Sequence, residues 1–260
     1  MRKIGINLGA RTDLSTEAYI RTIRELGFET VFTMSPAVKE DPSIPKLVEA
    51  AGLCFDTLHA PFGHINDIWY AEDNGMYREL TDCVDACAQV GAPIAVVHLS
   101  AGMQPPPPTD IGRGRFSELV SYATGKGIRI AFENQRMLGN IAWAFEEFQD
   151  AENVGFCWDC GHEACFTPGR QYMPLFGSRL ICTHIHDNSK QFNADLHQLP
   201  FDGGIDFDTV ASQIRGSGFD GPLMLEVNGR SELYSGFTAE AYLQRAAQAV
   251  KRLRRMTDGE

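Results

Sequence analysis

The sequence predicts an α/β protein with the TIM (β/α)8 barrel fold. Short apolar runs alternate with longer amphipathic runs eight times along the 260 residues, which is the pattern of repeated βα units. Eight such units close most economically into a barrel, and this length suits a single barrel. The first strand lacks a following G-x-G-x-x-G motif, which disfavours a doubly wound open sheet. We therefore expect one TIM-barrel domain over residues 1–260.

The individual elements follow from the apolar runs and from the residues that border them. Strands are expected near residues 3–8, 29–33, 53–58, 94–99, 128–133, 154–159, 180–186 and 222–227. Helices are expected near 15–26, 43–51, 74–90, 114–125, 140–149, 170–176, 206–216 and 238–255. Ser15 and Asp206 are typical helix-capping residues. Glycine stands where four of the helices should end, at Gly27, Gly52, Gly91 and Gly127. The last helix has basic residues in its final turns, which suits the helix dipole.

Composition excludes several classes of protein. The hydrophobic fraction is 43% and the charged fraction 22%, as in globular proteins, and no stretch approaches the roughly 20 apolar residues of a membrane span. A net charge of −11 argues against a general nucleic-acid binder, which needs Lys and Arg for phosphate contacts. Seven cysteines without an apolar signal segment indicate reduced thiols and a cytoplasmic location.

Potential metal ligands end several of the apolar runs. Glu133, Asp159, His184 and Glu226 end the expected strands five to eight, and the carboxyl ends of barrel strands meet at one mouth. Two Glu, one Asp and one His form a mixed oxygen and nitrogen ligand set, which suits one divalent metal: Mn, Co, Mg or Zn. Three carboxylates exceed what one divalent cation needs, so one remains for proton chemistry.

Several motifs together resemble one superfamily. They are Trp158-Asp159-Cys160-Gly161-His162, His184-Ile185-His186-Asp187-Asn188, Asp195-Leu196-His197-Gln198-Leu199-Pro200 and Gly203-Gly204-Ile205-Asp206-Phe207. With Gly5-Ile6-Asn7, His59-Ala60-Pro61-Phe62 and Leu225-Glu226-Val227, they resemble the xylose-isomerase-like TIM barrels over nearly the whole chain. That superfamily includes sugar isomerases, ketose 3-epimerases, inosose dehydratases and metal-dependent apurinic endonucleases.

The resemblance implies a role for each matching residue. Glu133, Asp159, His184 and Glu226 would hold the metal, and Glu133 and Glu226 would move the proton from opposite sides of the substrate. His162 would bind a substrate oxygen. Lys190 falls where the epimerases have an arginine on the substrate. We further expect substrate contacts from side chains that the motifs place near the mouth: His59, His98, His197, Phe62 and Trp69. His186 is expected to contact a metal ligand and orient it, without binding the metal itself.

Three functions remain open at this point. The first is isomerisation or epimerisation of a small sugar, keto-sugar or cyclitol through a metal-stabilised enediolate. A dehydratase or lyase would share the first proton transfer and then lose a hydroxyl. The third is a phosphodiester hydrolase like the apurinic endonucleases, whose three zinc ions have nine ligands. This chain has a candidate for each: His59, His98, Glu133, Asp159, His162, His184, Asp195, His197 and Glu226.

We prefer the sugar isomerase, with Asp195, His197 and His162 as additional metal ligands only if more than one metal binds. The acidic charge and the lack of a clear basic and aromatic wedge for DNA disfavour the hydrolase. A catalytically inactive barrel is disfavoured by the intact ligand set. We expect a small sugar-like substrate, no membrane partner and no nucleic-acid partner. The sequence leaves both a monomer and a homo-oligomer open.

Overall fold

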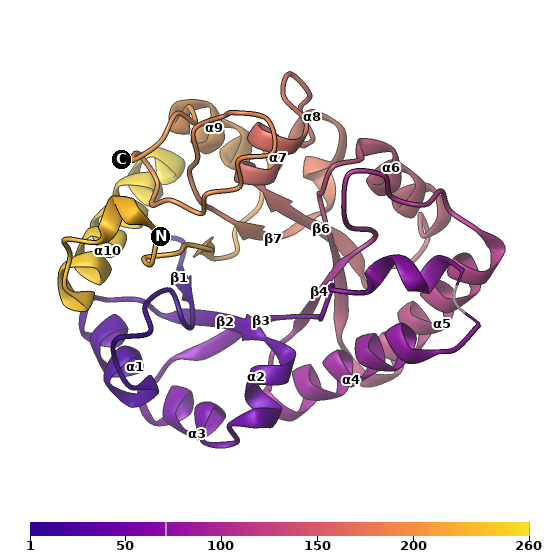
Figure 1. Ribbon diagram of the computed structural model, residues 1–260, viewed down its shortest axis with the longest axis horizontal. Coiled ribbons are helices and arrows are strands. Elements are labelled where there is room, and N and C mark those ends of the chain that lie inside the picture. Colours follow the sequence, from indigo (N-terminus) through magenta and orange to yellow (C-terminus); the bar gives the residue numbers. More distant parts are fainter. Residues whose placement is uncertain (71, 260) are drawn as a thin grey trace.

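The computed structural model describes residues 1–70 and 72–259 and contains eight parallel strands arranged in a ring (Figure 1). The strands are β1 (Ile4–Asn7), β2 (Thr30–Met34), β3 (Cys54–His59), β4 (Ile94–His98), β5 (Arg129–Glu133), β6 (Val154–Asp159), β7 (Leu180–His184) and β8 (Leu223–Leu225). Each strand from β1 to β6 pairs with the next one along the chain, and β1 also pairs with β8. This confirms the predicted barrel.

The ring closes between β7 and β8 through a short junction rather than a full ladder. The N–H of Ile185 donates to the carbonyl of Met224 at 2.8 Å, and the N–H of Glu226 donates to the carbonyl of Ile185 at 3.1 Å. We call this junction the seam. It lies immediately after His184 and immediately before Glu226, so barrel closure sets the distance between these two side chains.

Helices surround the barrel and cover its outer face (Figure 1). They are α1 (Thr16–Glu25), α2 (Ser35–Glu40), α3 (Ser43–Ala50), α4 (Gly75–Val90), α5 (Asp110–Lys126), α6 (Leu138–Glu147), α7 (Cys160–Phe166), α8 (Met173–Phe176), α9 (Phe207–Ser217) and α10 (Ala239–Asp258). Three 3-10 helices join them: η1 (Ile65–Trp69), η2 (Gly177–Arg179) and η3 (Glu232–Tyr234). In the described residues, no helix is long and apolar enough to cross a membrane.

The predicted helix boundaries have clear local causes. The Ser15 side chain accepts the N–H of Ala18, and the Asp206 side chain accepts N–H groups of the first turn of α9, which satisfies otherwise unpaired donors. Gly91 and Gly127 end α4 and α5 with φ values of 75° and 71°. Because other residues rarely adopt this left-handed conformation, glycine stops the helix at these two positions.

Some elements differ from the sequence prediction. The short helices α2 and α7 were expected to be loops, α5 begins at Asp110 instead of 114, and α8 is shorter than the expected helix 170–176. Strands β7 and β8 end at His184 and Leu225, before the expected ends. Helix α7 starts directly after β6 because the carboxylate of Asp159 accepts the N–H of His162 at 2.6 Å. A strand-end carboxylate thus serves as the helix cap.

The interior of the barrel is apolar below its mouth. A small cluster of buried side chains fills it, consisting of Ile94, Val96, Ala131, Cys157 and Cys182. A larger apolar core lies between the strands and the surrounding helices. All seven cysteines are free, and six of them are buried, which is the usual situation of a non-catalytic thiol. The apolar filling means that polar chemistry is confined to the C-terminal mouth and to a few positions near the strand starts.

Candidate metal centre

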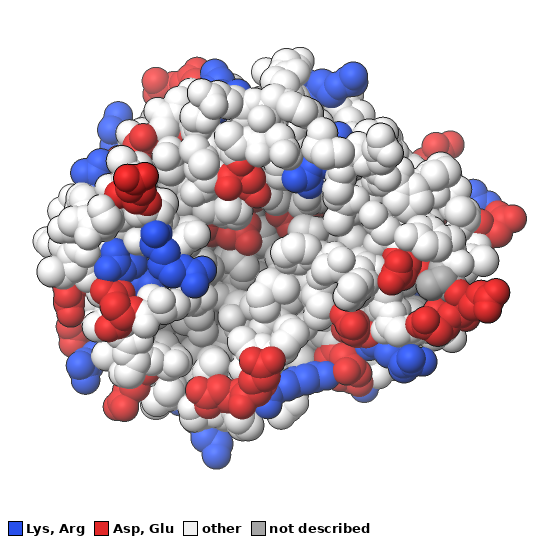
Figure 2. Space-filling model, in the orientation of Figure 1, with Lys and Arg blue, Asp and Glu red and all other residues white. Residues whose placement is uncertain are grey.

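The predicted metal ligands come together at the C-terminal mouth. Glu133, Asp159 and His184 are the last residues of β5, β6 and β7, and Glu226 directly follows β8. The centre of this face is hollowed and contains acidic side chains (Figure 2). Parallel strands bring the four side chains together because all of them leave the sheet at the same end. We refer to these four residues as the metal quartet.

The geometry of the quartet suits a cation better than a hydrogen-bond network. Its ligand atoms lie within 4.8 Å of one another. The Nδ1 atom of His184 lies 3.3 Å from Oε1 of Glu133 and 3.0 Å from Oε2 of Glu226. Two ligands of one metal at bond lengths of about 2.1 Å lie about 3.0–3.4 Å apart. The observed separations therefore allow these atoms to bind one metal ion.

Each member of the quartet also keeps a buried polar atom that forms no hydrogen bond with the protein. These atoms are Oε1 of Glu133, Oδ2 of Asp159, Nδ1 and Nε2 of His184, and Oε2 of Glu226. Leaving a charged group unpaired inside a protein is costly, so such atoms call for an explanation. A divalent ion between them would satisfy them, and the oxygen and nitrogen donors fit Mn²⁺, Co²⁺, Mg²⁺ or Zn²⁺.

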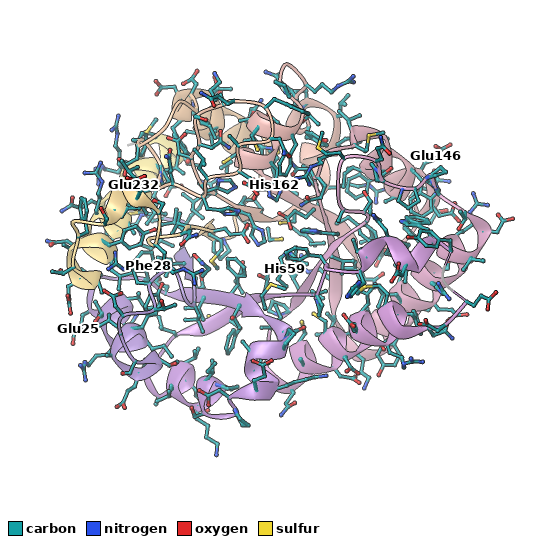
Figure 3. All side chains as sticks on the ribbon, in the orientation of Figure 1. Glu25, Phe28, His59, Glu146, His162 and Glu232 are labelled. Carbon is teal, nitrogen blue, oxygen red and sulfur yellow. The ribbon has the colours of Figure 1, made fainter. Side chains whose placement is uncertain are left out.

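Two further groups of potential ligands flank the quartet. In the first flanking group, Nε2 of His59 and Nε2 of His98 lie 3.0 and 2.9 Å from Oε2 of Glu133. The two histidines end β3 and β4. Glu133 therefore belongs to this group and to the quartet, with one carboxylate oxygen facing each. His59 and His162 lie at the centre of the barrel from different elements (Figure 3).

The second flanking group consists of His162, His186, Asp195 and His197. Oδ2 of Asp195 lies 3.4 Å from Nε2 of His162 and 3.2 Å from Nε2 of His197. Burial lowers the pKa of His197, but the hydrogen bond with Asp195 and the charge of Glu226 raise it to about 9. The same contacts with His162 and His197 outweigh burial and hold the pKa of Asp195 well below its usual value.

Neighbouring side chains hold the ligands in place. Asn134 exchanges two 2.8 Å hydrogen bonds with the backbone of Asp159. Nε2 of His186 lies 3.1 Å from Oδ1 of Asp159, in the supporting position that the sequence predicted. The ring of His186 lies so close to Gly161 that a Cβ there would come within 1.9 Å of it. Only glycine fits at this position, which explains the Cys-Gly-His motif.

In Glu133 and His184, the attraction of neighbouring charges outweighs the effect of burial on the pKa. Burial would raise the pKa of Glu133, but the charges of His184 and His98 and the close approach of the His162 and His184 rings hold it well below its usual value. Burial would lower the pKa of His184, but the carboxylates of Glu226 and Glu133 raise it well above its usual value. The Glu133 carboxylate is therefore ionised at neutral pH, and a metal would have to compete with a proton for His184.

A cavity of about 190 Å³ lies above these groups. Its lining includes residues that the sequence predicted: His59, Phe62, His98, Glu133, His162, Asp195, His197 and Glu226. Phe62 stacks on His98 with ring centroids 4.5 Å apart. The cavity is smaller than the roughly 300–1,000 Å³ of sites for drug-sized ligands, so it suits a molecule of about the size of a monosaccharide.

Two predicted substrate contacts lie outside this cavity. Trp69 is buried, its Nε1 donates to the carbonyl of Leu99 at 2.7 Å, and its ring packs against Phe116 and Trp143. The 3-10 turn η1 thus directs the ring into the packing between helices. Lys190 is exposed, and its stem lies over Gly204. Its backbone is left-handed, with φ of 59°, and Lys190 is not among the described residues that line the cavity.

Four residues that line the cavity were not predicted. They are Ala101, Gln135, Arg136 and Phe166. Nε2 of Gln135 lies 3.1 Å from Nε2 of His98 and 3.0 Å from Nδ1 of His162, so Gln135 links the two flanking groups. The sequence signal was the polar run that directly follows Glu133, because residues just after a barrel strand also face the mouth.

Comparisons with known proteins agree with this architecture. A family model described as xylose isomerase-like TIM barrel matches residues 20–256. The chain is 29% identical over 198 residues to the uncharacterized protein y4fM of Sinorhizobium fredii, which covers 68% of this chain and 60% of that protein. The match thus spans less than two thirds of that relative's length.

Two solved structures share the fold over almost their whole length. The 3-keto-D-glucoside 4-epimerase YcjR of E. coli has a TM-score of 0.76 at 18% identity, covering 98% of this chain and 99% of that one. A D-psicose 3-epimerase of Clostridium cellulolyticum H10, solved with D-tagatose, has a TM-score of 0.77 at 14% identity, with the same coverage. At these identities the likeness shows the barrel fold. The match over residues 20–256 shows more: the chain belongs to the xylose isomerase-like TIM barrel family.

Proposed function

We propose that this protein is a metal-dependent isomerase or epimerase of a small sugar-like substrate, with Glu133 and Glu226 as the acid–base pair. The observation that carries the proposal is the quartet, in which unpaired donor atoms meet beneath a cavity of monosaccharide size. The structural likeness to a 3-keto-D-glucoside 4-epimerase and a D-psicose 3-epimerase supports the same class of reaction.

The two glutamates differ in a way that suggests separate tasks. Glu226 is 21% exposed and approaches one histidine of the quartet, whereas Glu133 is 1% exposed. Each oxygen of Glu133 lies within 3.3 Å of two histidines. Glu226 is therefore the better group to take a proton from the carbon next to a carbonyl, and Glu133 would return a proton from the other side.

A divalent cation on the quartet would stabilise the negative charge that develops on the substrate oxygen. His162 and Gln135 line the same cavity and would orient substrate hydroxyl groups. The buried walls exclude water from the reacting carbon, which protects a carbanionic species from side reactions. A dehydratase would use the same first proton transfer, and it would be recognised by the loss of water from the product.

Metal content is the first test. We expect elemental analysis of protein purified without a histidine tag to find about one Mn, Co, Mg or Zn per chain, and less in Glu133→Gln. The loaded protein should then exchange a carbon-bound proton of D-psicose, D-tagatose or a 3-keto-glucoside with deuterated water, followed by NMR. A chain that binds no divalent metal at neutral pH would contradict the proposal.

The two flanking groups favour a second candidate, a phosphodiester hydrolase with three metal ions. Together with the quartet they supply all nine ligand positions of the endonuclease pattern. In that case about three zinc ions per chain and cleavage of an oligonucleotide with an abasic site are expected. The net charge of −11 argues against DNA as the substrate, so we rank this function second.

A further inference from the structure

The strongest unexplained feature of the cavity is Arg136, three residues after Glu133. Its guanidinium carbon lies 3.8 Å above the ring centre of Phe166, and its Nη2 donates to Oδ1 of Asn193 at 3.1 Å. Arg136 is the one Lys or Arg among the described residues that line the cavity. Three acidic residues, Glu133, Asp195 and Glu226, share the lining with it.

The charge of Arg136 is not neutralised by the protein. Among the described residues, no carboxylate oxygen lies within 4.0 Å of its nitrogen atoms, and its hydrogen-bond partner Asn193 is neutral. Its Nε is buried and has no partner in the protein. Arginines inside proteins are normally paired with acids, because leaving the charge without a partner costs free energy. Arg136 therefore keeps part of its hydrogen-bonding capacity, including that of Nε, for a ligand.

The orientation of Arg136 is set by Phe166, the last residue of α7. The same ring stacks on His162 at 4.8 Å, with 23° between the planes. Helix α7 is in turn anchored by Asp159. A guanidinium that lies flat on an aromatic ring presents its edge of N–H donors to the surroundings, and this planar edge matches both oxygens of a carboxylate.

The size of the cavity adds a further restriction. The cavity has a volume of only about 190 Å³. A ligand that contacts both Glu226 and Arg136 in this space must therefore carry its anionic group only a few atoms from the reacting carbon. A carboxylate at the end of a six-carbon keto-sugar meets this condition. A phosphate ester would need more room for its additional oxygen atoms.

We infer that Arg136 binds the carboxylate of the substrate, so that the substrate class is a keto-sugar acid rather than a neutral sugar. The inference rests on the proposed function. It also moves the substrate-orienting cation from the loop after β7, where Lys190 stands, to the loop after β5.

Two matched probes test the inference. 5-Keto-D-gluconate carries a carboxylate, and L-sorbose is its neutral counterpart with a hydroxymethyl group in that place. We expect calorimetric titration of the Mn²⁺-loaded protein to show that 5-keto-D-gluconate binds at least about 10-fold more tightly than L-sorbose. Hydrogen bonds to a charged group predict a difference of this size. Arg136→Met should abolish this preference and change L-sorbose binding less than about 2-fold. Arg136→Lys should keep part of it, since charge remains without the planar edge.

Arg170→Met is the matched control, because it also removes one positive charge but from an exposed position outside the cavity. It should retain the preference. Equal binding of the two probes, or binding of neither, would overturn the inference. So would loss of the preference in Lys190→Met but not in Arg136→Met. Inorganic phosphate is the third probe, and stronger competition by phosphate than by acetate would overturn the choice of a carboxylate.

The outcome is separate from that of the proposed function. Proton exchange on neutral sugars that does not depend on Arg136 would refute the inference and leave the isomerase intact. A carboxylate preference that depends on Arg136, without any proton exchange, would support the binding role and refute the isomerase.

Discussion

The mouth and the floor of this barrel both contain buried polar side chains, but they are organised differently. At the mouth, the unpaired atoms of the quartet lie within 4.8 Å of one another. Near the strand starts, which we call the floor, Oδ2 of Asp56 and the hydroxyls of Thr30 and Thr57 are also buried without partners. In the described part of the chain, these floor atoms belong to no group of potential metal ligands.

The comparison shows that buried polar atoms without partners indicate a binding site where several potential ligands lie together. An isolated buried polar atom only lowers the stability of the fold. Burial raises the pKa of Asp56 to about 6, although the charges of Arg129, His184 and Lys3 oppose it. No histidine pairs with its carboxylate, in contrast to the glutamates of the mouth. Asp56 also lies where the pairing of β2 and β3 is irregular. The floor carboxylate is therefore a strained exception within an otherwise apolar interior.

The largest effect is expected at the mouth, in Glu133→Gln. This change removes the carboxylate that the quartet shares with the first flanking group, so metal content should fall, and proton exchange should fall by about 10³-fold or more. Elemental analysis and NMR exchange rates measure the two effects. Glu146→Gln is the control, because Glu146 is exposed on α6 at the periphery (Figure 3). Full metal content in Glu133→Gln would refute the shared-ligand role.

The next largest effect is expected at the floor, in Asp56→Asn. A pKa raised from 3.8 to about 6 means that folding favours the protonated acid, so stability falls as the pH rises from about 4 to about 6. Above that range the cost is about 3 kcal/mol. The variant should therefore unfold at a higher temperature than the parent at pH 8 and at nearly the same temperature at pH 4. Asp220→Asn, at an exposed position, should show no such difference. A destabilised Asp56→Asn at pH 8 would contradict this account.

The third prediction concerns metal affinity at the mouth. We expect this affinity to rise with pH, whereas the contribution of Asp56 to stability falls with pH. The pKa of His184 is raised by Glu226 and Glu133, and a bound metal must displace its proton. Metal affinity should therefore rise with pH, by up to about tenfold per pH unit for each proton released. Titration with Mn²⁺ at pH 6, 7 and 8 would measure the slope. An affinity independent of pH in this range would show that no proton is displaced.

The smallest effect is expected for Trp69→Phe. This variant tests whether Trp69 contacts the substrate or only packs between the helices. The change removes the buried hydrogen bond to the Leu99 carbonyl, so the free energy of unfolding should fall by about 1–2 kcal/mol. Metal content and probe binding should stay unchanged, because the ring packs outside the cavity. Weaker binding of 5-keto-D-gluconate or L-sorbose without loss of stability would show that Trp69 contacts the substrate.

The sequence predicted the barrel and the meeting of the quartet because both depend on regular features. Each ligand ends an apolar run, and parallel strands deliver their ends to one place. The roles of these residues stay predictions until metal and substrate are measured. Arg136 escaped prediction because it lies in the short irregular segment after β5, and Phe166 because the sequence pattern did not predict the short helix α7. Trp69 and Lys190 lie outside the described cavity lining, in a 3-10 turn and at a left-handed residue whose local backbone the sequence pattern does not specify.

The seam gives the quartet a mechanical role in addition to its chemistry. His184 and Glu226 stand on either side of the junction that closes the barrel. Two backbone hydrogen bonds of Ile185 and two hydrogen bonds of the Thr183 hydroxyl join the strands there. An ion bound by both residues would link the end of β7 to the end of β8. The ligand-bound barrel should then open less often at β7 and β8, so that the amide of Ile185 exchanges its hydrogen more slowly as metal is added. Loss of the ion would loosen the ring at the junction between β7 and β8.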